Sequence, residues 1–207
     1  MKTNDFKFFG MLKAFTLIAA ISIGTISCDN QELDEMNAAN SLENNSNSIF
    51  KSSNSAPAKG NTSIAGIAVG AGFNELVGAL VYVDKELNAG LVNLFANGKD
   101  QYTVFAPTDA AFKNLYAALN VDDITDLPAT LVLDVLKYHV VEGRRAANSV
   151  VPRSGSREIT TILGATFSVN NTGMIKAVGN TASITAANIS ASNGIIHVVD
   201  TVLLPIK

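Results

Sequence analysis

The segment TVFAPTDAAF, residues 103–112, decides how the first half of the domain folds. Residues 102–106 are a short β-type run, and Pro107 ends further strand pairing because proline has no backbone N–H. Thr108 then offers a side-chain oxygen to the first unpaired amides of a helix, and Asp109 places a negative charge in that helix's first turn. The segment therefore predicts a strand that passes directly into a helix.

A second segment, NGIIHVVDTVLLP (193–205), predicts a strand that is buried on both faces. Asn193-Gly194 supplies a turn before it, since Asn and Gly tolerate positive φ. Residues 195–199, IIHVV, are almost all apolar and mostly β-branched, which is typical of a strand between two packed layers. We expect His197, inside this run, to be a buried and hydrogen-bonded core histidine.

The rest of the domain divides into helices first and strands second. Apolar residues recur at helical spacing in three stripes, which are Phe73, Leu76, Val77 and Leu80; Leu87, Leu91, Leu94 and Phe95, ended by Gly98; and Phe112, Leu115, Tyr116 and Leu119. Pro128 begins a fourth predicted helix that runs to about Tyr138. The predicted strands are 158–163, 165–170, 174–178, 182–186 and 195–203, with a turn at Asn171-Thr172-Gly173. This order predicts an α+β fold rather than an alternating α/β fold.

Three segments together resemble the fasciclin domain. TVFAPTDAAF (103–112) is similar to the family's first signature, NGIIHVVDTVLLP (193–205) to its second, and LKYHVVEG (136–143) to its central block. The resemblance covers residues 63–207. It implies a β-wedge of two small sheets, with helices from the N-terminal half packed against it, and a role in cell adhesion or other extracellular interactions.

The pair Tyr138-His139 in the central block has two interpretations. In animal relatives this block is linked to integrin recognition, so the resemblance marks Tyr138 and His139 as an adhesion contact. The alternative, which we favour, is structural. Tyr138 lies at a helix end, where its ring can be buried while its hydroxyl stays hydrogen-bonded.

The N-terminus predicts export and lipid attachment. Residues 1–13 carry three lysines and residues 14–26, AFTLIAAISIGTI, carry no charge, which is typical of a secretory signal. The apolar run is shorter than the roughly 20 residues that span a bilayer. Thr25-Ile26-Ser27 before Cys28 resembles the lipobox of bacterial lipoproteins. We therefore expect residues 1–27 to be a signal peptide and Cys28 to be lipidated, which would anchor the protein in a membrane.

The residues that begin at Cys28 are predicted to form a tether. Residues 29–35, DNQELDE, resemble the acidic stretch of surface-exported lipoproteins of Bacteroidetes, which implies an outer-membrane location, facing the periplasm or the outside. Residues 28–62 are rich in Asn and Ser and poor in large apolar side chains, so they bury too little surface to offset chain entropy. Residues 63–207 are long enough for a core of their own, and we expect them to fold as a monomeric domain.

Composition and charge restrict the function. The net charge of −3, with no Lys or Arg cluster larger than Arg144-Arg145, argues against nucleic-acid binding. One cysteine and two histidines argue against a disulfide framework or a metal site, and we expect no cofactor and no enzymatic activity. Arg144 and Arg145 form either a solvated loop or a contact for an acidic protein or polysaccharide.

Two functions follow from these observations. The first is a non-enzymatic envelope lipoprotein that mediates cell adhesion or contacts with an extracellular protein or matrix. The second is an accessory lipoprotein on the same fold that binds a glycan or a small ligand. The identity of the partner is outside what the sequence predicts.

Overall fold

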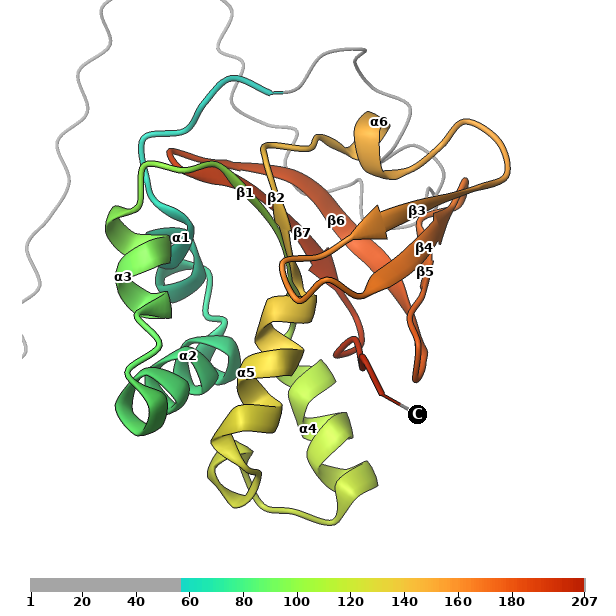
Figure 1. Cartoon of the computed structure of the whole chain (residues 1–207). Helices are drawn as coiled ribbons and strands as arrows, with labels where there is room; N and C mark the ends of the chain where they lie inside the picture. Colours follow the sequence, from blue (N-terminus) through green and yellow to red (C-terminus); the bar gives the residue numbers. More distant parts are fainter. Residues whose placement is uncertain (1–56, 207) are drawn as a thin grey trace, which may run out of the picture. The chain divides into compact units, whose positions relative to one another are not determined.

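The computed structural model describes residues 57–206 and has the expected α+β organisation (Figure 1). The helices are α1 (Ile64–Gly70), α2 (Asn74–Leu87), α3 (Leu91–Asn97), α4 (Asp109–Leu119), the 3₁₀ turn η1 (Ile124–Asp126), α5 (Ala129–Tyr138) and α6 (Ala147–Val150). The strands are β1 (Tyr102–Pro107), β2 (Val140–Glu142), β3 (Ser156–Thr160), β4 (Thr166–Asn170), β5 (Met174–Lys176), β6 (Thr181–Ala191) and β7 (Gly194–Val199). The predicted signal peptide 1–27, Cys28 and the tether up to residue 56 lie outside the described residues.

The segment 103–112 folds as predicted. β1 ends at Pro107, and the Thr108 hydroxyl accepts a hydrogen bond from the Ala111 amide of α4 at 3.2 Å. Asp109 occupies the first turn of α4, but its carboxylate also reaches the start of α2, where it accepts from the Glu75 amide at 3.0 Å. One acidic residue therefore stabilises the N-terminal ends of two helices.

The strands are hydrogen-bonded in the order β2-β1-β7-β6-β5-β4-β3. β7 is parallel to β1 and antiparallel to β6. β6 belongs to both halves of this order, because residues 181–183 pair with β5 and residues 184–191 pair with β7 across two register shifts. The two small sheets of the expected wedge therefore share β6.

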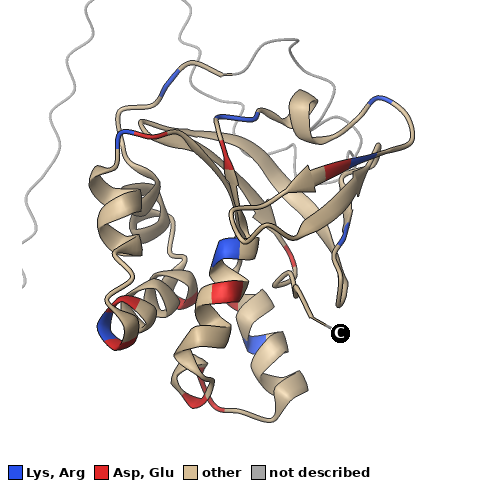
Figure 2. Cartoon of the chain, viewed as in Figure 1, with Lys and Arg blue, Asp and Glu red and all other residues tan. Residues whose placement is uncertain are grey.

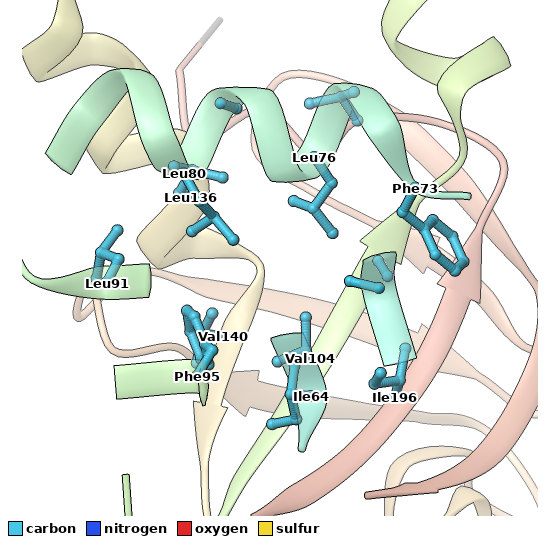
Figure 3. Packing of buried hydrophobic residues seen from close by; sticks show 14 of the residues in the cluster. Ile64, Phe73, Leu76, Leu80, Leu91, Phe95, Val104, Leu136, Val140 and Ile196 are labelled. Carbon is cyan, nitrogen blue, oxygen red and sulfur yellow. The ribbon is translucent and has the colours of Figure 1, made fainter. Parts of the chain in front are cut away.

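Two buried clusters lie on the two faces of β1 and β7, because successive strand residues point in opposite directions. On β1, Val104 belongs to the first cluster and Phe105 to the second. On β7, Ile196 belongs to the first cluster and Val199 to the second, and every residue of this strand is buried. The first cluster lies against the helices, where side chains from α1, α2 and α5 converge on β1 and β7 (Figure 3). The two-faced burial predicted for residues 195–199 is confirmed.

The stripe from Leu87 to Phe95 is not one helix. α2 ends at Leu87, and the chain turns through Asn88 and Gly90, both with positive φ, before α3 begins. The Asp84 carboxylate accepts hydrogen bonds from the first two amides of α3, at 2.8 Å each. The residues on each side of the turn are helical, but the Asp84 side-chain cap lets the chain begin a separate helix at Leu91.

The strands of the second half differ from the predicted ranges mainly at their ends. β6 extends to Ala191, beyond the predicted 182–186, because it pairs with strands of both sheets. β7 stops at Val199, short of the predicted residue 203, because the following backbone bonds to side chains outside the sheet. Residues 140–142, which had no predicted strand, pair with β1 as β2.

Candidate functional site

Tyr138 is the last residue of α5, and its side chain is fully buried. Its hydroxyl donates to the Thr166 carbonyl at 2.8 Å and accepts from the Val178 amide at 3.3 Å. Its ring meets Phe167 edge to face, with centroids 5.8 Å apart. Burial raises the pKa of the Tyr138 phenol above its usual value. The residue thus connects the end of α5 to β4 and to the segment after β5.

His139 follows at the C-terminal cap of α5 and is 3% exposed. The Leu203 amide donates to Nε2 at 2.9 Å, so the ring proton resides on Nδ1 and is donated to the Val135 carbonyl at 2.7 Å. Burial lowers the pKa of His139 to about 4. The neutral ring joins α5 to the C-terminal segment and has no nitrogen left for another ligand.

His197 is the second buried histidine, at the centre of β7. Its Nδ1 accepts from the Asn188 amide at 3.4 Å, so Nε2–H donates to the Arg145 carbonyl at 2.9 Å. Burial lowers its pKa to about 4 as well. His197 is therefore a hydrogen-bonded core histidine, as its place in the apolar run predicted.

Arg144 and Arg145 are neighbours in sequence but have different surroundings. The Arg144 guanidinium is half-buried and donates to the carbonyls of Ala191, Gly194 and Pro57 and to the Ser190 hydroxyl. Arg145 is exposed, and within residues 57–206 its guanidinium donates only to the Glu142 carbonyl, at 3.4 Å. Of the pair, the Arg145 side chain is the one accessible to a partner from solvent.

Residues 57–62, which composition placed in the tether, are bonded to the β6–β7 hairpin. The Arg144 guanidinium and the Ser190 hydroxyl both donate to the Ala58 carbonyl, and the Ser192 amide donates to the Thr62 carbonyl at 2.8 Å. Gly60 lies so close to Ser190 that a Cβ there would be 2.3 Å from its carbonyl oxygen. This last part of the tether is therefore held against the domain.

Asn193 has a structural role that sequence reasoning missed. The residue is 4% exposed, its Oδ1 accepts from the Ile64 amide at 2.8 Å, and its Nδ2 donates to the Phe95 carbonyl at 2.9 Å. Gly194 does not have positive φ, but a Cβ at this position would lie 2.1 Å from the Tyr102 carbonyl. The Asn-Gly pair was expected only as a turn, whereas it fixes α1 and α3 and allows β1 to approach β7.

The titratable side chains are dispersed rather than gathered into a centre. Within residues 57–206, no group of three or more His, Cys, Asp or Glu side chains is arranged to hold a metal ion. In the same range, no helix is long and apolar enough to cross a bilayer. Tyr138 and His139 are brought together with the C-terminal segment, while Arg145 lies apart on the surface after β2.

Several known proteins have similar amino-acid sequences. Immunogenic protein MPB70 of Mycobacterium bovis is 36% identical over 142 residues, which cover 67% of this chain and 68% of MPB70. Protein sll1483 of Synechocystis is 37% identical over 141 residues, which cover 67% of this chain and 72% of that protein. Cell surface glycolipoprotein MPB83 of M. bovis is 35% identical over 106 residues, which cover 51% of this chain and 44% of MPB83.

The fold itself has a solved counterpart. The FAS1 domain pair from the insect cell adhesion molecule fasciclin I aligns with a TM-score of 0.51 at 17% identity, covering 70% of this chain and 51% of that chain. At this identity the likeness shows a shared fold. The fasciclin domain model matches residues 71–205, a range that includes all seven strands and the Tyr138-His139 junction. Because this match spans more than half of the chain, the protein belongs to the fasciclin domain family.

Proposed function

We propose that this protein is a lipid-anchored envelope protein that mediates adhesion or binds an extracellular protein or matrix partner through its fasciclin domain, without catalysing a reaction. The match of residues 71–205 to the fasciclin domain carries the proposal. The names of two similar proteins support it, one a cell surface glycolipoprotein and the other a cell adhesion molecule.

The anchor in this proposal is a lipid on Cys28, the sole cysteine of the chain. Its position, with one residue between it and the uncharged run of residues 14–26, is typical of a processed lipoprotein. With two acyl chains attached, an N-terminus holds a bilayer firmly, since each buried methylene contributes about 0.8 kcal/mol. The outer membrane is the location that we propose for the anchored protein.

The Cys28→Ala substitution should abolish incorporation of a radiolabelled fatty acid and release the protein from the membrane fraction. Both effects follow from loss of the acylated thiol. Labelling of cells that produce either form, followed by fractionation, measures them. Ser27→Ala is the matched control, because it keeps a small residue before an intact cysteine. Equal labelling of the wild type and Cys28→Ala would contradict the anchor.

The adhesion role predicts saturable binding of the folded chain to an extracellular protein. The Cys28→Ala chain, tested against immobilised matrix proteins and polysaccharides, should bind at least one protein, and binding should disappear when the chain is denatured. Because Tyr138 and His139 are buried, we expect the contact to use exposed side chains instead. If the Cys28→Ala chain binds none of the surfaces to which cells that produce the wild type attach, the proposal is contradicted.

Charge distribution favours glycan binding as the second candidate. Acidic residues predominate on the helices, while basic residues predominate among the loops and strands of the second half (Figure 2). Residues 139–206 carry Arg144, Arg145, Arg153, Arg157 and Lys176 against Glu142, Glu158 and Asp200. An acidic polysaccharide would be attracted to this half at low ionic strength. In the same screen, binding to acidic polysaccharides and to none of the proteins would favour a glycan over a protein as the partner.

A further inference from the structure

Basic residues from three separate segments lie at one end of the strands β1, β2, β6 and β7. β1 and β7 are parallel and begin at this end, while β2 and β6 are antiparallel to their neighbours and stop there. Residues 57–62 are bonded to the β6–β7 hairpin at the same end. We name this region the basic end; its exposed cations are Lys59, Lys99 and Arg145.

Hydrogen bonds between distant segments hold the basic end together. The Ser192 amide donates to the Thr62 carbonyl at 2.8 Å, and the Gln101 side-chain amide donates to the Ser192 carbonyl at 3.3 Å. The Gly143 amide donates in turn to the Gln101 carbonyl at 2.8 Å. These bonds join the three short segments that carry Lys59, Lys99 and Arg145.

The three exposed cations are available to a partner. Within residues 57–206, none of them forms an ion pair. Arg144 adds a half-buried cation that is held by carbonyl and hydroxyl oxygens rather than by a carboxylate. Asp100 and Glu142 lie in the same segments, so the cations at this end outnumber the carboxylates.

The helices carry the opposite charge. α2, α4, η1 and α5, with the loop before η1, contain three lysines and eight acidic residues, which are Lys85, Lys113 and Lys137 against Glu75, Asp84, Glu86, Asp109, Asp122, Asp123, Asp126 and Asp134. Figure 2 shows basic segments along the edge formed by residues 57–62 and the loop after β2, and acidic segments on the helices away from it. An anionic surface therefore attracts this domain with the basic end foremost.

The chain from Cys28 joins the domain at the basic end. Pro57 is the first described residue, and its carbonyl accepts from the Arg144 guanidinium at 3.2 Å. A chain anchored through Cys28 keeps its own bilayer at a high effective concentration beside the end to which it is attached. This attachment favours a bilayer over a soluble glycan as the anionic partner. The attachment argument rests on the proposed anchor, whereas the charge distribution does not.

We propose that the basic end binds the phosphate headgroups of the bilayer that holds the Cys28 anchor. Lys59, Lys99 and Arg145 contact the headgroups, and the acidic helices face away from the bilayer. The contact is electrostatic, so it is reversible and weakens as salt increases. The domain surface on the helices then stays accessible to an adhesion partner while the basic end is covered.

Flotation of the Cys28→Ala chain with vesicles tests this contact without a lipid on the protein. Vesicles of equal parts phosphatidylglycerol and phosphatidylcholine should bind the chain more tightly than vesicles of phosphatidylcholine alone. Raising NaCl from about 20 mM to about 500 mM should remove this difference, because salt screens the attraction between separate charges.

A triple variant with Lys59→Gln, Lys99→Gln and Arg145→Gln removes the exposed cations of the basic end. A basic residue near an anionic bilayer contributes up to about fivefold to binding. The triple variant in the Cys28→Ala chain should therefore bind the anionic vesicles at least about tenfold more weakly. All three side chains are exposed, and circular dichroism should show an unchanged fold.

The matched control carries Lys85→Gln, Lys113→Gln and Lys176→Gln. It loses the same net charge from exposed lysines on α2, α4 and β5, outside the basic end. Its affinity for the anionic vesicles should change by less than about twofold, because the effect of a charge falls off within a Debye length of the surface. Residues 1–27, which include three lysines, are identical in both variants, so their own binding cancels in the comparison.

Equal affinities of the triple variant and its control for anionic vesicles would overturn the proposal. So would loss of polygalacturonate binding in the triple variant with vesicle binding unchanged, because the basic end would then be a glycan contact. Fatty-acid labelling of Cys28 keeps this proposal apart from the anchor. A labelled wild type together with equal variants rejects the basic end alone, whereas an unlabelled wild type together with a weakened triple variant rejects the anchor alone.

Discussion

Replacing Tyr138 with alanine should lower the free energy of unfolding by about 3–5 kcal/mol, the usual range for an aromatic side chain removed from a core. The ring is fully buried and packs on Phe167, so its loss leaves a cavity. It also leaves the Thr166 carbonyl and the Val178 amide without the hydroxyl that now pairs with them. Urea unfolding of the full chain, followed by circular dichroism, measures the change.

Tyr138→Phe is the graded control for this result. It keeps the ring and removes only the hydroxyl, so it should cost about 1–3 kcal/mol through the two groups left unpaired. Binding to a partner should fall in both variants only as the folded fraction falls. If Tyr138→Ala instead unfolds at the same urea concentration as the wild type but no longer attaches to the surface that the wild type binds, Tyr138 and His139 form an adhesion contact.

Acidification from pH 7 to pH 4 should destabilise the domain by about 3 kcal/mol for each buried histidine. His139 and His197 have folded-state pKa values of about 4, below the value of 6.5 expected in the unfolded chain. Between these values the unfolded chain binds more protons, so stability falls as pH decreases. The contribution is complete above about pH 6.5 and is lost progressively as the pH approaches 4.

Denaturant titrations at half-unit pH steps measure this dependence. The slope of unfolding free energy against pH gives the number of protons taken up on unfolding, and this number should approach two between pH 6 and pH 4.5. His139→Gln and His197→Gln should each reduce that slope by about one proton, although each also lowers stability at pH 7 through imperfect hydrogen bonds. Asp123, whose pKa is lowered by hydrogen bonds from Thr125, contributes mainly below about pH 4.5, at the acid end of the titration. A flat profile between pH 6.5 and pH 4.5 would show that the histidines are not buried as neutral groups.

The sequence alone determined the features that depend on near neighbours in the chain. Pro107, Thr108 and Asp109 predict the strand-to-helix junction because a missing N–H, a cap oxygen and a first-turn charge act within a few residues. The nearly continuous apolar run in residues 195–199 predicts a strand buried on both faces, because strand side chains alternate between the two sides and both sides of this strand are therefore apolar. The same local patterns, together with three segments resembling the fasciclin domain, were enough to predict the fold.

The tertiary structure decided what depends on residues distant in the chain. Asn193 bonds to the Ile64 amide across 129 residues, and Asp109 caps α2 across 34 residues. The tautomer of His139 depends on the Leu203 amide, 64 residues away. An apolar cavity of about 100 Å³, too, exists only where α1, α2, α3 and α5 meet β1 and β2. No local pattern encodes these contacts, because a hydrogen bond or a cavity requires two distant segments to be placed within a few ångströms, and chain folding alone provides that placement.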